Sequence, residues 1–298
     1  MTAARSVVLE DRGILAIGGP DRVGFLQGLI SNDATRVSRD RAVYAALLTP
    51  QGKYLHDFML AAVGDEIWLD TEAARLDELK RRLSIYRLRA KVTLDARPEL
   101  AVGAVFDGGL LDLPDEAGAA RPLDGGVAFV DPRLAALGAR VVLPRSHLAP
   151  ALQEAGTQAA DFAEYDRLRL SLGVPDGRRD LVLDKSILLE SGFDELNGVD
   201  WDKGCYIGQE LTARTKYRGL VKKRLFPVRI DGPAPAAGTL IEQDGREAGE
   251  LRSSRDGIGL ALLRLEALQQ GGALTAGEAA LRPLSPGWMR LPESSAES

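Results

Sequence analysis

The chain has 298 residues, of which 45% are hydrophobic and 27% are charged, and its formal net charge is −5. This composition is ordinary for a globular protein, and the length suggests two or three packed units at ~150 residues per domain. The acidic balance argues against a generally basic nucleic-acid coat, although a local basic patch remains compatible with it.

In the first two thirds of the chain, the hydrophobic pattern predicts short strands interspersed with single helices. Alternation predicts a hairpin formed by Ser6–Leu9 and Gly13–Ile17, and helical spacing of apolar residues follows it. Thr71 is a plausible N-cap for a helix that runs to about Arg82. Further strands are predicted at Ala42–Leu48, Tyr54–Val63, Ile67–Asp70, Lys91–Asp95, Leu100–Phe106 and Arg140–Leu143, and further helices at Ser146–Ala155 (with Ser146 as its cap) and Asp161–Leu172. Such a distribution indicates an α+β fold.

The pattern changes near residue 220. From Lys222 onward, short strands are separated by turn sequences such as Asp244-Gly245 and Asp256-Gly257, with little helical periodicity. This is typical of a small β-barrel or sandwich. We therefore predict a body over residues 1–220, with an uncertain internal boundary, and a C-terminal β-barrel over residues 221–298.

Several familiar chemistries lack their residues. One cysteine and two histidines are too few for a thiolate zinc site or an internal iron–sulfur site, so no metal site is predicted. The sequence also lacks a P-loop, a G-x-S-x-G elbow and a G-x-G-x-x-G fingerprint. A lone cysteine is compatible with a reducing compartment, residues 1–10 lack the features of a signal or transit peptide, and no apolar run approaches ~18 residues. We expect a cytoplasmic protein with no membrane partner.

The segment Lys203-Gly204-Cys205-Tyr206-Ile207-Gly208-Gln209-Glu210 is the most informative part of the sequence. Its glycines are typical of a turn, where a cysteine is more accessible than the usual buried one. A helix is expected to begin near Gln209, and a thiol near a helix N-terminus or beside Lys203 can have a lowered pKa. The residues alone leave two interpretations open, because a lone cysteine is also often a small structural residue.

A basic cluster follows this segment without any intervening acidic residue. It consists of Arg214, Lys216, Arg218, Lys222, Lys223 and Arg224. Charge runs are usually solvated surfaces or linkers. The functional alternative is a site for an anion, either a polyglutamate tail or the phosphates of RNA.

The segment from Val199 to Thr215 resembles the K-G-C-Y-x-G-Q-E signature of the YgfZ-like branch of the GcvT family and of its mitochondrial counterpart in iron–sulfur maturation. The likeness continues through Gly173–Gly177, Leu189–Ser191 and Lys223–Val228, and Phe25–Asp33 looks like the first helix of the family and the loop after it. It therefore covers nearly the whole chain and is strongest between about residues 165 and 228.

The resemblance implies a ring of ferredoxin-like subdomains with a C-terminal small β-barrel. It also implies tetrahydrofolate, with or without a polyglutamate tail, as the cofactor, and the folate-binding residues that it suggests are Asn32, Asp33, Asp57 and Arg214. Two departures from the aminomethyltransferase of this family stand out. Its adjacent acidic pair is replaced by His56-Asp57, and the glutamate that holds its pterin aligns with Ser171, whose hydroxyl cannot replace a carboxylate that accepts two N–H bonds.

We therefore expect a tetrahydrofolate-binding accessory protein for the assembly or repair of iron–sulfur enzymes, including those that modify tRNA. Cys205 would be the functional thiol, with Lys203 favouring its thiolate and with Tyr206, Gly208, Gln209 and Glu210 completing the motif. The expected partners are reduced folate and iron–sulfur enzymes or assembly factors. Two alternatives stay open: a tetrahydrofolate-dependent aminomethyl or C1 transferase that uses Asp57, and a non-catalytic tRNA-binding module. The sequence does not decide whether the protein is an enzyme.

Overall fold

The computed structural model describes residues 4–108 and 111–290, which divide into two compact units. The first unit takes in the described residues of Met1–Thr49, Leu55–Tyr165 and Asn197–Ile207. The second takes in Pro50–Tyr54, Asp166–Leu196 and the described part of Gly208–Ser298. The chain therefore passes between the units several times, and each unit is described here by itself.

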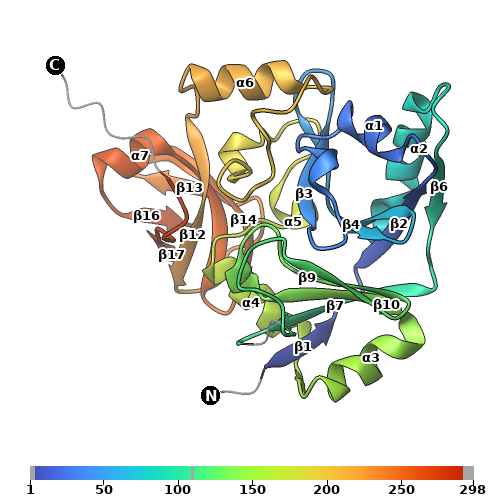
Figure 1. The fold of residues 1–298 in the computed structure, drawn as a ribbon. Helices are drawn as coiled ribbons and strands as arrows, with labels where there is room; N and C mark the ends of the chain where they lie inside the picture. The colour runs from blue at the N-terminus through green and yellow to red at the C-terminus, as the bar shows by residue number, and fades with distance from the viewer. Residues whose placement is uncertain (1–3, 109–110, 291–298) are drawn as a thin grey trace. The chain divides into compact units, whose positions relative to one another are not determined.

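A five-stranded sheet forms one half of the first unit, in the strand order β3-β4-β5-β2-β6. Its strands are β2 (Arg12–Gly18), β3 (Val43–Leu48), β4 (Tyr54–Val63), β5 (Glu66–Glu72) and β6 (Thr93–Ala96). Helices α1 (Arg22–Gln27) and α2 (Leu76–Tyr86) lie near this sheet in Figure 1. Leu26 of α1 and Leu83 of α2 share one buried cluster with strand residues such as Leu15 and Phe58, so the two helices cover the apolar face of the sheet.

A six-stranded sheet forms the other half, in the order β11-β1-β7-β10-β9-β8. Its strands are β1 (Arg5–Val8), β7 (Leu100–Phe106), β8 (Ala120–Leu123), β9 (Gly126–Val130), β10 (Ala139–Pro144) and β11 (Gln158–Ala159). Helix α3 (Arg145–Glu154) buries Leu148 and Leu152 against it. Both side chains lie 3.2 Å from where a Cβ on Gly103 of β7 would stand, so Gly103 gives α3 room to pack closely.

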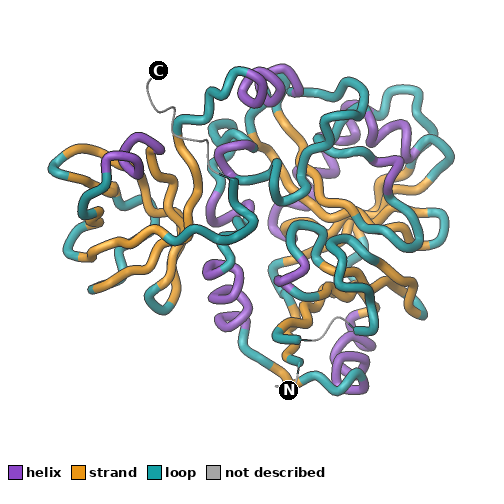
Figure 2. Tube along the Cα trace, turned by 60° about the vertical axis from the view of Figure 1, so that its left-hand side comes forward, coloured by secondary structure: helices purple, strands orange, loops and turns teal. Residues whose placement is uncertain are grey.

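The second unit contains a closed barrel, in the order β12-β15-β14-β13-β16-β17. Its strands, coloured orange in the trace of Figure 2, are β12 (Lys223–Asp231), β13 (Leu240–Gln243), β14 (Arg246–Arg255), β15 (Ile258–Arg264), β16 (Leu274–Ala276) and β17 (Ala279–Pro283). Helices α5 (Gly177–Asp180), α6 (Gln209–Tyr217) and α7 (Leu265–Gln270) also belong to this unit, and α4 (Phe162–Ser171) begins in the first unit and ends in the second. The predicted α+β body and C-terminal barrel are confirmed.

Three local predictions were wrong. β1 and β2 do not form a hairpin: β1 pairs with β7 and β11, and β2 pairs with β5 and β6. Thr71 is no N-cap, because it lies in β5 and its hydroxyl donates to the carbonyl of Asp57, and α2 begins only at Leu76. Ser146 lies inside α3, whose N-cap is Pro144. In the first two cases, strand pairing with other parts of the unit overrode a plausible local signal.

Within the described ranges, no helix is long and apolar enough to cross a lipid bilayer.

Candidate functional site

Cys205 is exposed on a loop of the first unit that is fixed on both sides of the cysteine. On the N-terminal side, the Asp200 carboxylate accepts hydrogen bonds from the backbone N–H groups of Asp202 and Lys203, each 2.9 Å long. On the C-terminal side, the N–H of Ile207 donates to the carbonyl of Gly28 at 3.2 Å. The loop thus presents an accessible thiol from an ordered backbone rather than from a free tip.

Lys203 supplies the strongest attachment of this loop. Its buried ammonium donates to the carbonyl oxygens of Ile30 (2.6 Å) and Asn32 (2.7 Å), in the turn that follows α1. Burial lowers the pKa of Lys203 to about 8, while the carboxylates of Asp33 and Asp200 oppose that shift. The ammonium therefore anchors the loop, a task that the sequence did not indicate. Its predicted effect on the thiolate of Cys205 stays a prediction.

Asn32 and Asp33 organise the turn that receives Lys203. The Asn32 amide donates to the carbonyls of Tyr44 (2.8 Å) and Asn197 (2.7 Å), and its oxygen accepts from the Asp33 N–H. Asp33 caps a short 3-10 helix by accepting from the backbone N–H and the hydroxyl of Thr35. These two of the four predicted folate-binding residues thus have structural roles, and both the nitrogen and the oxygen of the Asn32 amide form hydrogen bonds within the protein.

Asp57 lies on β4 beside a buried tyrosine. The Tyr44 hydroxyl donates to Asp57 at 2.9 Å, and the guanidinium carbon of Arg133 lies 5.7 Å from the centre of the Tyr44 ring. Burial and the Asp57 carboxylate raise the pKa of Tyr44 well above its ordinary value, although Arg133 opposes the shift. Tyr44 is therefore a neutral donor that holds the carboxylate in place.

A buried network of alternating acidic and basic side chains extends from Arg133. Asp131 accepts from Arg133 at 2.7 Å and lies 3.5 Å from Arg140, and Asp70 accepts from both Arg140 (2.8 Å) and Arg12 (2.6 Å). Sequence reasoning missed Tyr44, Arg133 and this network. The available signal was the occurrence of charged residues within or directly after apolar strands, because such residues stay buried only when paired.

His56, the neighbour of Asp57, is buried beside Arg75 and Glu78. Its Nε2 lies 3.4 Å from the Arg75 guanidinium and 3.9 Å from the Glu78 carboxylate. Burial, then the Arg75 charge, lower the pKa of His56 to about 3. The imidazole is therefore neutral at physiological pH and does not replace the missing second carboxylate.

This pKa predicts how the stability of the fold depends on pH. Between pH 7 and pH 5 the unfolded chain takes up a proton at His56 and the folded chain does not, so stability falls as pH falls, by about 2 kcal/mol from this residue. Urea unfolding of the native protein and of His56→Gln should show the loss in the native protein and a shallower pH dependence in the variant. Equal pH dependence in both would contradict the assignment.

In the second unit, α6 begins directly after Gly208, which has a φ of 83°. A positive φ favours glycine at this position. Gln209 is half-buried at the start of α6, and Glu210 and Arg214 are exposed on it. The predicted helix is confirmed, while binding of folate by Arg214 stays a prediction. The two units divide the motif between Ile207 and Gly208, so its residues do not all belong to one compact unit.

The basic cluster after the motif carries its own counter-ions. Arg224 is buried and pairs with Glu195 at 2.7 Å, Lys216 pairs with Asp194, and Lys223 lies 3.9 Å from Glu247. The remaining members, Arg214, Arg218 and Lys222, are exposed. Half of the cluster therefore has acidic partners that the sequence separation concealed, which weakens the interpretation as a basic surface.

Two further features bear on bound groups. Within the described residues, no three histidine, cysteine, aspartate or glutamate side chains gather as they would around a metal ion. Ser171, which aligns with the pterin-binding glutamate, is exposed, and its hydroxyl donates to the carbonyl of Leu168 at 2.7 Å. It supplies no carboxylate to a pterin.

The fold matches that of a solved enzyme. The glycine cleavage system aminomethyltransferase T from Bartonella henselae superposes with a TM-score of 0.80 at 16% sequence identity, covering 96% of this chain and 86% of that one. Residues 222–291 match the CAF17 C-terminal beta-barrel domain. The protein therefore has a GcvT-like fold with a C-terminal barrel, as the resemblance predicted.

Two mitochondrial proteins named iron-sulfur cluster assembly factor IBA57 are similar over most of their length. The human protein is 36% identical over 306 residues, which cover 94% of this chain and 84% of that protein. The mouse protein is 36% identical over 283 residues, covering 88% and 78%. The chain belongs to the IBA57 family, and the predicted relationship to mitochondrial iron–sulfur maturation proteins is confirmed.

Proposed function

We propose that this protein is an assembly or repair factor for iron–sulfur enzymes and that Cys205 is its functional thiol. The observation that carries the proposal is the exposed cysteine on a loop that Lys203 and Asp200 hold in one conformation. Membership of the IBA57 family supports the iron–sulfur role. From the YgfZ-like resemblance of the motif, we also propose that the client enzymes include some that modify tRNA.

The number of cysteines limits what the thiol can do. Iron–sulfur clusters are usually held by four protein ligands, chiefly cysteine thiolates, and this chain has one cysteine. Cys205 would therefore share a cluster, or react with one, together with ligands from a partner protein. A fixed loop suits this task because little conformational entropy is lost when the thiol meets its partner.

Cells that lack the gene test the proposed role. Iron–sulfur enzyme activities should fall in these cells, a cluster-free enzyme of the same metabolism should keep its activity, and a plasmid copy of this chain should restore the first group. Equal losses in both kinds of enzyme, or no loss in either, would contradict an iron–sulfur role.

We also propose that the first unit binds reduced folate through Asp57. Asp57 fits a pterin in one respect: its carboxylate, positioned by Tyr44, can accept hydrogen bonds from the N–H groups of the ring. When bound, tetrahydrofolate would supply one-carbon chemistry or act as a regulator. Asn32 fits less well, because its amide already bonds within the protein.

Calorimetry tests the folate site. Tetrahydrofolate should give saturable heat with the native protein, and Asp57→Asn should weaken binding by about tenfold, because a charge-assisted hydrogen bond is lost. Asp65→Asn, at the exposed turn between β4 and β5, is the matched control and should bind like the native protein. Neither heat nor a thermal shift at millimolar ligand would overturn this part of the proposal.

The other two alternatives receive less support. A site for aminomethyl transfer in this chain would have only one carboxylate, that of Asp57. A neutral His56 stands in place of the second carboxylate, and Ser171 stands in place of the pterin-binding glutamate. Activity in a glycine-cleavage assay would nevertheless favour a transferase. A tRNA-binding surface would have to rely on Arg214, Arg218 and Lys222, since the other members of the basic cluster have acidic neighbours.

A further inference from the structure

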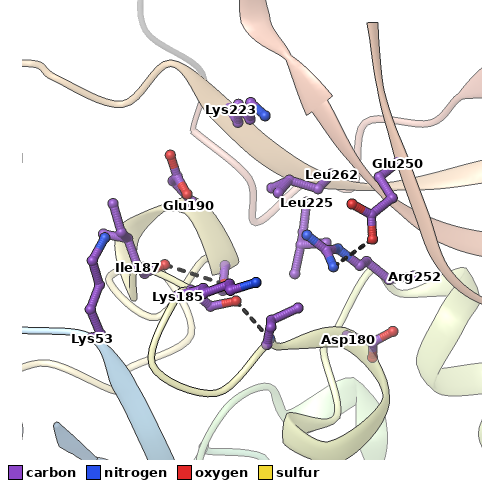
Figure 3. Close-up of a pocket in the computed structure, with 13 residues that line it drawn as sticks. Lys53, Asp180, Lys185, Ile187, Glu190, Lys223, Leu225, Glu250, Arg252 and Leu262 are labelled. Atoms are coloured by element: carbon purple, nitrogen blue, oxygen red, sulfur yellow. Dashed lines mark hydrogen bonds and ion pairs between the residues drawn. The ribbon is translucent and has the colours of Figure 1, made fainter. Parts of the chain in front are cut away.

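A pocket of about 410 Å³ lies wholly within the second unit. It is lined by the turn before β4, by the segment that follows α5, and by strands β12, β14 and β15 (Figure 3). Four apolar side chains form part of its wall: Val182, Ile187, Leu225 and Leu262. This volume is within the range of small-molecule sites in proteins.

Basic residues from four separate segments line this pocket. Lys53 precedes β4, Lys185 follows α5, Lys223 lies on β12 and Arg252 lies on β14. Such convergence differs from the basic cluster predicted from the sequence, because residues up to 199 positions apart contribute to one cavity. Three carboxylates also line it: Asp180, Glu190 and Glu250.

Two of these carboxylates are already occupied by other groups. Asp180 accepts from the Arg169 guanidinium at 2.6 Å and from the hydroxyl of Ser253. Glu250 pairs with Arg252 at 2.8 Å, as the dashed line in Figure 3 shows. Among the carboxylates that line the pocket, Glu190 is therefore the main one that offsets the positive charge of the lysines. Glu247, which does not line the pocket, lies 3.9 Å from Lys223.

Glu190 lies where the positive charges of three of the pocket residues act together. Its partial burial raises its pKa, and the charges of Lys53, Lys223 and Arg252 act on it in the opposite direction. The same three cations therefore reach one region of the pocket. An anion placed beside them would be attracted by all three charges in a partly desolvated environment.

Arg252 contributes its charge from a largely buried side chain. Its side chain is 13% exposed, and among the described residues its buried Nε finds no hydrogen-bond partner. An unsatisfied buried N–H group is uncommon, and native structures usually provide it with an acceptor. Because this Nε is enclosed by protein atoms, Arg252 contributes to the pocket through its positive charge rather than through this N–H group.

We propose that this pocket binds a small organic dianion, a dicarboxylate or a phosphate monoester, with Lys53, Lys223 and Arg252 as its cationic partners. The apolar wall would contact the carbon body of the ligand, while one anionic group accepts from Arg252. The site uses neither Cys205 nor Asp57 and shares only Lys223 with the basic cluster considered for a polyglutamate tail, so its failure would leave the proposed function standing.

Calorimetry at low ionic strength tests the proposal with two probes, glutarate and glycerol 3-phosphate. At least one should bind saturably, and the one that binds tighter identifies the anionic group; glutaramide, the neutral analogue of glutarate, should not bind. Raising the salt concentration should weaken binding, because the pocket is open to solvent screening. If neither dianion saturates below about 10 mM, or if glutaramide binds equally well, the proposal is wrong.

Charge variants locate the binding. The double variant Lys53→Gln/Lys223→Gln should weaken dianion binding by about tenfold or more, since two of the three attractive charges are removed. Glu190→Gln should strengthen it several-fold, because the opposing carboxylate is lost. Lys91→Gln, an exposed lysine of the first unit, removes the same charge outside the pocket and should change nothing. Unchanged affinity in both the double variant and Glu190→Gln would overturn the proposed site, provided that both keep the native melting temperature.

Discussion

Cys205→Ser is expected to abolish rescue of iron–sulfur enzyme activity in cells and to leave the protein folded. The substitution is nearly isosteric, and an exposed side chain contributes little to the core, so the unfolding free energy should change by less than about 0.5 kcal/mol. A hydroxyl, however, is neither a comparable nucleophile nor a soft ligand for iron. Melting temperature and complementation measured on the same variant check both halves of this prediction.

The opposite pattern would identify Cys205 as a structural residue. In that case the melting temperature would fall and the cellular defect would follow the loss of stability. Gly204→Ala is a suitable control beside the thiol, because nothing lies within 4 Å of the position of its added Cβ. A stable Cys205→Ser protein that fully rescues the cells would refute the role of the thiol.

Lys203→Met should cause a larger loss of stability than Cys205→Ser. It removes an ammonium that donates to the carbonyls of Ile30 and Asn32 at 2.6 and 2.7 Å and leaves both acceptors without it. Charged hydrogen bonds contribute ~1.5–3 kcal/mol each, so a loss of about 2–4 kcal/mol is expected after the gain from burying an apolar side chain. Urea denaturation measures this directly.

The variant also tests how the loop supports the thiol. Because Lys203 anchors the loop, iron–sulfur rescue should weaken even at a temperature where Lys203→Met is folded. Lys185→Met, at an exposed lysine, is the matched control for stability and should cost less than about 0.5 kcal/mol. A Lys203→Met protein as stable as this control would contradict the anchoring role.

Elements that lie between clear turn sequences were predictable from the sequence. Tyr54–Val63 was predicted with the bounds that β4 has, because a mostly apolar run is flanked by the turn sequences Thr49–Gly52 and Gly64-Asp65. The separation of β1 and β2 was not predictable in the same way, since a tight turn that is typical of a hairpin here connects two different sheets. Helix α7 was missed because it lies among the short strands and turns of the barrel, a region with little helical periodicity in the sequence.

The candidate site was predictable only at the level of its motif. The sequence indicated an accessible Cys205, and the structure exposes it. It gave no indication that the Lys203 ammonium bonds to carbonyls 173 and 171 positions away, or that Glu195 neutralises Arg224. Such contacts depend on the tertiary arrangement, which neither spacing nor charge pattern along the chain contains.

Alkylation of the single cysteine tests the central claim most directly. Purified protein, treated with iodoacetamide or left untreated, is added to an extract of cells that lack the gene, and recovery of an iron–sulfur enzyme is followed. We predict that untreated protein restores the activity and that protein modified at Cys205 does not, although its melting temperature is unchanged. Treated and untreated Cys205→Ser should be equally inactive. Full recovery with completely alkylated protein would contradict the account.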